Sequence, residues 1–280
     1  MENRFKFGIC VDNGYPDPIA ERIKMVKRVG FDALFTGWSD GCDMEKWANE
    51  IARQGLIYQS VHAPFGHVDR LWEDPGEEGE KYADMLVRCI GDCARFDVKI
   101  MICHVIIGMD RHTPTELGLT RYARLVEEAE RQGVTIAFEN TEGMEYLEAV
   151  MKSFSHSPAC GFCWDTGHEQ CYNYGRDMMA LYGDKLVGTH INDNFGMADR
   201  NVMTWLDDSH LMPFDGIIDW AGVAKRLDDH GFDDVMTMEL TCKSKPGKTT
   251  HDIYKNLTCE EFFAQALERC RRVAALRRAD

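Results

Sequence analysis

Ionisable side chains stand at or near the ends of most of the apolar segments in this chain of 280 residues. An apolar segment buried on both faces has no physical reason to finish in an ionisable residue, because burying an unpaired charge costs several kcal/mol. The simplest explanation of the pattern is that these residues form one functional site. The residues concerned are His62, His104, Glu139, Asp165, His190 and Glu239.

Four of these residues belong to consecutive segments, and they are Glu139, Asp165, His190 and Glu239. Three carboxylates crowded together repel one another unless a cation holds them. Three oxygen ligands and one imidazole suit Mn²⁺ or Mg²⁺, and Co²⁺ or Zn²⁺ is also compatible. Alternatively, each residue could simply make its own local hydrogen bond at a strand end. This alternative explains a single such residue well, but it explains four in consecutive segments poorly. We therefore predict a site for one divalent metal ion.

The segments that carry these residues read as buried strands, and segments of helical period alternate with them. The expected strands are 7–12, 33–38, 57–64, 100–106, 135–140, 161–168, 187–194 and 235–240. The expected helices are 18–30, 43–55, 79–96, 115–133, 143–154, 176–183, 217–231 and 259–278. Several of these helices close on a glycine, which can adopt the left-handed conformation of a helix C-terminus.

Continuous apolar strands, each followed by an amphipathic helix, imply a parallel sheet covered by helices. Eight such units in 280 residues predict an α/β fold, a single (β/α)8 TIM barrel that occupies residues 1–280 as one domain. The carboxyl ends of neighbouring strands then meet at one rim, where the metal-type residues would lie together. A doubly wound open sheet is the alternative. The sequence DNGYPDP after the first strand lacks the glycine-rich phosphate loop of dinucleotide-binding folds.

Two loops on the expected rim are longer than ordinary connections, and such loops usually shape a binding pocket. They span 65–77 and 195–216, and the second contains Asp208 and His210, which are candidates for an additional metal ion. A third loop carries the only basic cluster on the rim, with Lys243, Lys245 and Lys248 in the sequence KSKPGK. This cluster could hold a distal phosphate or carboxylate, although exposed basic loops are more often merely solvated.

The bulk composition limits the kinds of partner. Thirty-two basic and 47 acidic residues give a formal net charge of −15, which repels polyanions and argues against nucleic acid or an anionic membrane surface. No signal peptide or membrane-spanning stretch is evident, so we expect a cytoplasmic protein. The eleven cysteines are spread along a chain of ordinary globular composition, and we expect them to be reduced thiols in the core.

Several short motifs carry a resemblance to a known family. They are HAPFG at 62–66, the strand-end His104, ENTEG at 139–143, WDTGH at 164–168, THINDN at 189–194, DSHLMPFDGIIDW at 208–220 and MEL at 238–240. Together they resemble the xylose-isomerase-like TIM barrels, the superfamily of sugar phosphate isomerases and epimerases and of AP endonuclease family 2. The superfamily also includes inosose dehydratases and endonuclease IV. The resemblance covers nearly the whole chain.

The resemblance to the epimerase branch implies that Glu139, Asp165, His190 and Glu239 bind one metal ion. It also implies that Glu139 and Glu239 face opposite sides of a sugar substrate as the catalytic residues. A metal ion that chelates a ketose or keto-polyol through its carbonyl and adjacent hydroxyl oxygens acidifies the neighbouring C–H bond and stabilises an enediolate. One carboxylate can then remove a proton while the other returns it. This mechanism predicts a metal-dependent isomerase or epimerase.

Histidines complete the expected site. The substrate-binding residues are predicted to be His62, His104, His168 and His210, with a packing or ligand-orienting role as the alternative for each. One feature departs from the family pattern, because Phe214 and Asp215 stand where many members have PGxG. We expect these two residues to change the pocket wall and to repel a phosphate.

Other functions remain open at this point. A keto-sugar lyase or dehydratase would begin with the same proton abstraction. A multinuclear-zinc phosphoesterase similar to endonuclease IV would use nine residues of matching type, His62, His104, Glu139, Asp165, His168, His190, Asp208, His210 and Glu239. A non-catalytic receptor that keeps the barrel for ligand binding is the third alternative. We expect a small-molecule sugar as the partner, and a homo-oligomer is compatible with the sequence.

Overall fold

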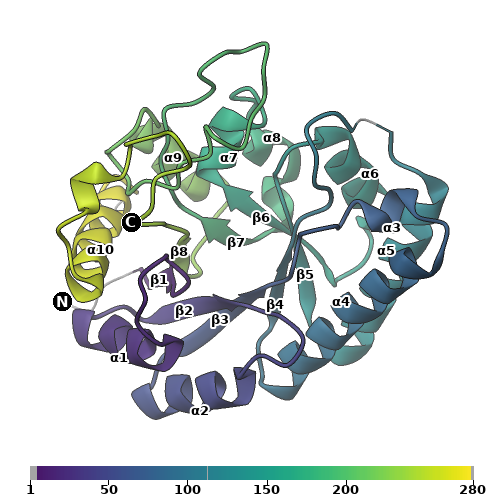
Figure 1. Ribbon diagram of the computed structural model, residues 1–280, viewed down its shortest axis with the longest axis horizontal. Coiled ribbons are helices and arrows are strands. Elements are labelled where there is room, and N and C mark those ends of the chain that lie inside the picture. Colours follow the sequence, from purple (N-terminus) through teal and green to yellow (C-terminus); the bar gives the residue numbers. More distant parts are fainter. Residues whose placement is uncertain (1–4, 112, 279–280) are drawn as a thin grey trace.

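The computed structural model describes residues 5–111 and 113–278, and eight parallel strands form a nearly closed barrel within them (Figure 1). The strands are β1 (Phe7–Cys10), β2 (Ala33–Gly37), β3 (Ile57–His62), β4 (Ile100–Cys103), β5 (Thr135–Glu139), β6 (Cys160–Asp165), β7 (Leu186–His190) and β8 (Met236–Met238). The predicted TIM barrel is confirmed. Most strands end earlier than the sequence suggested, because the residues that follow them turn into the loops of the rim.

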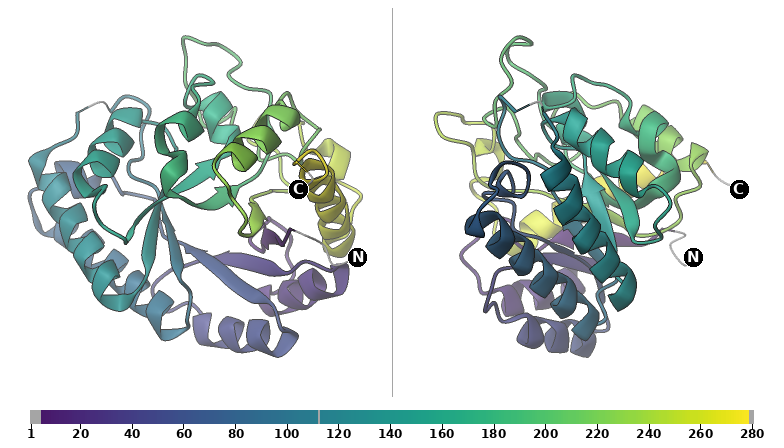
Figure 2. Two further views of the ribbon diagram at one scale, coloured as in Figure 1. Left: turned by 180° about the vertical axis from the view of Figure 1, so that it is seen from behind. Right: turned by 90° about the vertical axis from the view of Figure 1, so that its right-hand side faces the viewer.

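Helices lie outside the strands and cover the barrel on all sides (Figures 1 and 2). They are α1 (Ile19–Val29), α2 (Met44–Gln54), α3 (Arg70–Glu73), α4 (Glu77–Arg95), α5 (Glu116–Gln132), α6 (Met144–Phe154), α7 (Thr166–Cys171), α8 (Met178–Tyr182), α9 (Trp220–Asp229) and α10 (Cys259–Ala274), with 3-10 turns η1 (Gly183–Lys185) and η2 (Asp252–Tyr254). Gly30, Gly55 and Gly133 end their helices in the left-handed conformation, as predicted. Within the described residues, no helix has the length and apolar character needed to cross a membrane.

The sheet order runs from β8 through β1 to β7, so only the contact between β7 and β8 lacks a regular ladder. A single backbone bridge, between Ile191 and Met238, joins the two strands there. The hydroxyl of Thr189 accepts a hydrogen bond from the backbone N–H of Thr237 at 2.9 Å. The barrel is therefore closed at this seam largely by one bridge and one side chain.

The interior of the barrel is narrow and filled by small side chains. A Cβ added to Gly188 on β7 would stand 3.6 Å from Ile102 on β4, across the barrel. Ile102, Ala137 and Cys163 form a small buried cluster of their own, apart from the larger core between strands and helices. This packing fills the lower part of the barrel, where Gln59 is also buried, and the ionisable side chains lie at the carboxyl ends of the strands. All eleven cysteines are free thiols.

Candidate metal and substrate site

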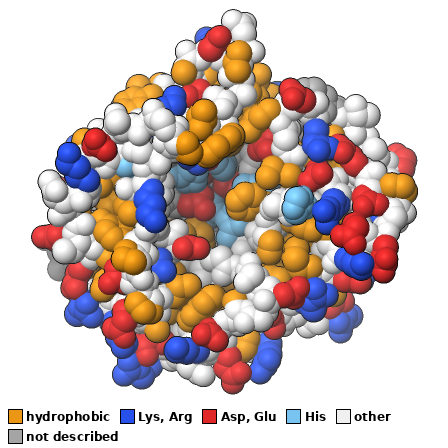
Figure 3. Space-filling model, viewed as in Figure 1, with side chains coloured by type: hydrophobic (Ala, Val, Ile, Leu, Met, Phe, Trp, Pro, Cys, Tyr) orange, Lys and Arg blue, Asp and Glu red, His pale blue; other side chains and the backbone are white. Residues whose placement is uncertain are grey.

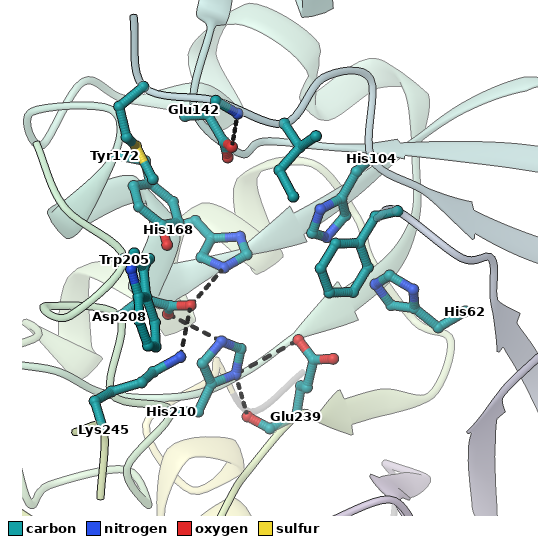
Figure 4. Close-up of a pocket in the computed structure, with 14 residues that line it drawn as sticks. His62, His104, Glu142, His168, Tyr172, Trp205, Asp208, His210, Glu239 and Lys245 are labelled. Atoms are coloured by element: carbon teal, nitrogen blue, oxygen red, sulfur yellow. Dashed lines mark hydrogen bonds and ion pairs between the residues drawn. The ribbon is translucent and has the colours of Figure 1, made fainter. Parts of the chain in front are cut away.

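A cavity of about 600 Å³ opens at the carboxyl ends of the strands. Histidine and acidic side chains form its floor, and apolar side chains gather around its mouth (Figure 3). Its volume is in the range of pockets for small molecules. The lining residues are His62, Phe65, His104, Ile107, Gly108, Met109, Glu142, His168, Tyr172, Trp205, Asp208, His210, Glu239 and Lys245 (Figure 4).

The four residues predicted to bind a metal ion converge beneath this cavity. Glu139, Asp165 and His190 are the last residues of β5, β6 and β7, and Glu239 directly follows β8. One ligand atom from each of the four residues lies within 4.8 Å of the other three. The carboxylates of Glu139 and Glu239 approach the same nitrogen of one imidazole, since Nδ1 of His190 is 2.9 Å from Oε1 of Glu139 and 3.1 Å from Oε2 of Glu239.

Asparagines that the sequence analysis did not single out hold Asp165 in place. Asn140 pairs with the backbone of Asp165 in both directions, at 2.9 and 2.8 Å. Asn192 donates a hydrogen bond of 2.7 Å to Oδ2 of Asp165. A Cβ at Gly167 would lie 2.0 Å from the side-chain oxygen of Asn192. The close contact between these two segments therefore requires glycine at position 167. Each asparagine belongs to a motif that the resemblance had identified, and that was the available signal.

Four histidines surround the carboxylate of Glu139, which is fully buried. His190 and His168 approach Oε1 at 2.9 and 3.4 Å, respectively. His104 and His62 approach Oε2 at 3.1 and 3.4 Å. Glu139 is thus the central acidic group of the site.

A second acidic centre lies on the other side of His168. Oδ2 of Asp208 is 3.6 Å from Nε2 of His168, and Oδ1 is 2.9 Å from Nε2 of His210. Nδ1 of His210 in turn lies 3.5 Å from Oε2 of Glu239 (Figure 4). His210 has a backbone φ of 51°, a left-handed conformation that is strained for a non-glycine residue and is common at functional sites. All nine residues weighed in the sequence analysis therefore come together.

Burial and charge act in opposite directions on these groups. Burial raises the pKa of Asp165 to about 6, although the charge of His168 opposes the rise. Burial also raises the pKa of Glu239, but the positive charges of His190 and His210 have the larger effect and lower this pKa to about 2. For His190, burial lowers the pKa, yet the adjacent carboxylates raise it well above its ordinary value. The crowded carboxylates thus draw positive charge into the site.

Several buried polar atoms here make no hydrogen bond of good geometry, although imidazoles lie near some of them. They include Oε2 of Glu139, Nδ1 of His168 and Nε2 of His190. Each unsatisfied buried group costs about 1–3 kcal/mol, so such a cluster calls for a further partner. Carboxylate oxygens and imidazole nitrogens are the ligands that divalent ions use in proteins. The donor set therefore fits a divalent metal ion.

More than one group of residues here could bind a divalent metal ion. Ligand atoms of His62, His104 and Glu139 also lie within 4.8 Å of one another, and so do those of Asp165, His168 and His210. Glu139 and Asp165 are each shared with the central group. Side chains could thus surround more than one cation beneath the same cavity.

One expectation about the pocket wall is wrong. Phe214 and Asp215 do not line the cavity, because Phe214 packs against Trp220 and Asp215 pairs with Arg269 at 3.1 Å. These contacts turn both side chains away from the site, so Asp215 is not positioned to repel a phosphate there. Conversely, Trp205, Tyr172 and Glu142 line the cavity, although none of them was named as a candidate. Glu142 belongs to the ENTEG motif and Trp205 to the long loop 195–216, and these were the available signals.

Comparison with known proteins agrees with this geometry. A family model described as xylose isomerase-like TIM barrel matches residues 23–258. The chain belongs to the xylose isomerase-like TIM barrel family. The resemblance inferred from the motifs is therefore confirmed, and the described barrel is the fold of this family.

Members of this fold with solved structures superimpose over nearly the whole chain. The IOLI protein with a binding zinc atom gives a TM-score of 0.77 at 16% identity and covers 99% of this chain and 100% of its own. A D-tagatose 3-epimerase-like protein gives 0.72 at 19% identity and covers 97% of this chain and 98% of its own. At such identities the likeness establishes the fold alone.

A relative among curated proteins matches only a part of this xylose isomerase-like barrel. The uncharacterized protein y4fM of Sinorhizobium fredii is 35% identical over 94 residues, which are 33% of this chain. The same match covers 27% of that protein, so the chain corresponds to about a quarter of the relative's length.

Proposed function

We propose that this protein is a divalent-metal-dependent isomerase or epimerase that acts on a ketose or a keto-polyol. The observation that carries the proposal is the convergence of Glu139, Asp165, His190 and Glu239 within 4.8 Å beneath a cavity of small-molecule size. The superposition with a D-tagatose 3-epimerase-like protein supports the same class of substrate. The chemistry follows from the positions of the two glutamates.

Glu139, Asp165, His190 and Glu239 would hold the metal ion. When bound, the ion supplies positive charge to the carbonyl and adjacent hydroxyl oxygens of a substrate and so acidifies the neighbouring C–H bond. The surrounding imidazoles of His62, His104, His168 and His210 orient the substrate oxygens. The apolar mouth of the cavity excludes water from the reacting carbon.

Glu139 and Glu239 are suited to proton transfer. Both carboxylates approach Nδ1 of His190, at 2.9 and 3.1 Å. Glu239 lines the cavity, and Glu139 lies buried beneath it. Both pKa values are lowered despite burial, because the charge of His190 favours the ionised forms. In the proposed reaction, one carboxylate accepts the proton from the substrate carbon, and the other returns a proton to the opposite face or to the neighbouring carbon.

The first test measures metal content and proton exchange together. We expect about one Mn, Co, Mg or Zn per chain on the purified protein, and exchange of a ketose α-proton with D₂O in a panel that includes D-fructose, D-tagatose and D-xylulose. Glu139→Gln should bind less metal and lose about 100- to 10,000-fold of the exchange rate. Glu148→Gln, on the exposed face of α6, is the matched control. Absence of exchange with every ketose and every one of these metals would overturn the proposal.

Product analysis separates an isomerase or epimerase from a keto-sugar lyase. Both begin with removal of the same proton. A lyase also expels a β-substituent, so its product has lost water, whereas an isomerase or epimerase returns a product of unchanged mass. Mass spectrometry of the reaction mixture distinguishes the two.

The three overlapping ligand groups favour one second candidate, a multinuclear-zinc phosphoesterase. In this alternative, His62 and His104 bind a further ion with Glu139, and His168, Asp208 and His210 surround another. Two or three zinc ions per chain, reduced in His104→Gln, together with cleavage of abasic-site DNA would support it. A single metal ion and intact DNA would exclude it.

A further inference from the structure

One lysine reaches the cavity while its neighbours in the same loop do not. Lys245 is the only lysine or arginine among the described residues that line the cavity. Lys248 pairs with Asp207 at 3.4 Å, and Lys243 is exposed and lies against Gly14. Of the three lysines in this loop, Lys245 therefore lines the cavity, whereas Lys243 and Lys248 do not.

The ammonium of Lys245 has donors available toward the cavity. Nζ lies 3.6 Å from Oδ2 of Asp208, which is beyond the length of a hydrogen bond. Asp208 already has His210 at 2.9 Å and His168 at 3.6 Å. Lys245 and Asp208 thus form an ion pair without a direct hydrogen bond, and the ammonium can still donate to a ligand (Figure 4).

An aromatic wall stands beside this cation. Nζ of Lys245 is 5.4 Å from the centre of the Trp205 ring, and Trp205 remains 49% exposed on the loop between β7 and α9. A large, half-exposed ring at the edge of a cavity can cover the apolar face of a sugar and reduce the local dielectric constant. The attraction between Lys245 and an anion would then be stronger than in water.

Two side chains connect Lys245 to the metal-type residues. Asp208 contacts both Lys245 and His168, and Nδ1 of His168 lies 3.4 Å from Oε1 of Glu139. The cation is therefore separated from the central glutamate by two side chains. Glu239 and Lys245 line the same cavity of about 600 Å³. A ligand with its carbonyl end at the metal-type residues can therefore place its far end at Lys245.

We propose that Lys245 binds an anionic group, a carboxylate or a phosphate, at the far end of the substrate, with Trp205 packed against the substrate carbon chain. The proposal rests on the proposed function for the position of the carbonyl end. It makes the substrate an anionic ketose derivative rather than a neutral sugar. In a site lined by acidic residues, one placed cation provides this selectivity.

The test compares neutral and anionic ligands that are otherwise alike. The pairs are D-fructose with D-fructose 6-phosphate and D-xylulose with D-xylulose 5-phosphate, and 5-keto-D-gluconate provides the carboxylate arm. Dissociation constants are measured by calorimetry on the full chain with its bound metal. The variants are Lys245→Met, Lys245→Arg and, as the matched control from the same loop, Lys243→Met. Quenching of tryptophan fluorescence, absent in Trp205→Phe, locates the ligand.

We expect at least one anionic ligand to bind more tightly than its neutral counterpart. In Lys245→Met its affinity should fall about 10- to 100-fold, the range for loss of a charged hydrogen bond, while neutral ligands and Lys243→Met are unaffected. Lys245→Arg should retain most of the affinity. Preference for the phosphate arm or the carboxylate arm identifies which anion is bound.

The inference and the proposed function fail in different ways. Equal binding of anionic and neutral ligands, or equal losses for both in Lys245→Met, overturns the inference even if α-proton exchange occurs. Binding of an anion that depends on Lys245, without proton exchange on any substrate, overturns the proposed function and leaves the anion site intact. No binding of any anionic ligand to the wild-type chain overturns the inference.

Discussion

The positions of His168 and His190 favour protonated rings, and a metal ion would have to displace a proton from each ring that it binds. The adjacent carboxylates raise the pKa of His190 above its ordinary value although burial acts in the other direction. The same balance raises the pKa of His168. An imidazole must be neutral to bind a metal ion, so metal and protons compete for these rings.

We therefore predict that metal binding releases protons and that metal affinity falls as the pH falls. Because the pKa of His190 lies above about 6.5, its usual value, the competition persists at neutral pH and weakens only in more alkaline solution. Calorimetric titration with Mn²⁺ or Zn²⁺ in two buffers of different ionisation enthalpy measures the protons released. An affinity that is constant between about pH 6 and 9 would contradict the assignment of His190 as a ligand that loses a proton when the metal ion binds.

Asn192 provides a second prediction at the scale of a residue. Its amide donates to Oδ2 of Asp165 at 2.7 Å and so orients a carboxylate that burial would otherwise favour in the protonated form. We expect Asn192→Ala to weaken metal binding about 10- to 100-fold, as loss of a group that orients a ligand usually does. The exposed Asn201→Ala is the control. Unchanged metal affinity in Asn192→Ala would show that Asp165 needs no such support.

Residue types in the sequence predicted the acidic and histidine residues of the site, but not the residues around them that hold them in place or line the cavity. Glu139 and His190 stand out because an ionisable residue is rare at the end of a buried strand. Asn140 and Trp205 do not stand out, since asparagine is common in loops and tryptophan is common in cores. Their importance depends on which side chains lie across the cavity, and that is a property of the folded chain.

At the scale of elements, periodicity located the strands and the long helices well. The apolar periodicity left few alternatives for α5 and α10, and α5 also ends at a glycine C-cap, Gly133. The short helices α3 and α7 were missed because four to six residues are too few to show a helical period. Helix α7 begins directly after Asp165, whose side chain accepts a hydrogen bond from the backbone N–H of His168. The same carboxylate thus starts a helix and faces the site.

Helix α10 offers a prediction at this scale. It packs beside α1 near the two ends of the described chain (Figure 1), and its first turn is fixed by a capping box between Thr258 and Glu261. Thr258→Ala removes the side chain that caps the helix, and we expect the free energy of unfolding to fall by about 0.5–2 kcal/mol. Urea unfolding followed by circular dichroism measures this change. Thr249→Ala, an exposed loop position, is the control, and an equal loss in both variants would contradict a capping effect.

At the scale of the whole molecule, alternation of strands and helices predicted the closed barrel but not where its closure is weakest. Seven neighbouring pairs of strands share regular ladders, and β7 and β8 do not. Strand pairing depends on the register and twist of the completed barrel, which no single segment encodes. This seam lies immediately below His190 and Glu239, so the stability of the barrel and the geometry of the site are linked there.

The last prediction concerns this seam. The Thr189 hydroxyl accepts from the backbone N–H of Thr237 at 2.9 Å, and both residues are buried. Thr189→Val keeps the shape of the side chain but leaves that N–H without its partner, which should cost about 1–3 kcal/mol of stability. Because His190 and Glu239 directly follow on the two sides of the seam, we also expect weaker metal binding. Thr135→Val, at the start of β5, is the matched control.

Hydrogen exchange distinguishes a local from a global effect of Thr189→Val. If the hydroxyl closes the barrel, the amides of Thr237 and Ile191 should exchange faster, while amides in the regular ladder between β5 and β6 keep their protection relative to global unfolding. Unchanged exchange at the seam, with stability equal to that of Thr135→Val, would mean that the backbone bridge between Ile191 and Met238 is sufficient. The barrel would then be closed without the hydroxyl, and the contact of Glu239 with His190 would not depend on Thr189.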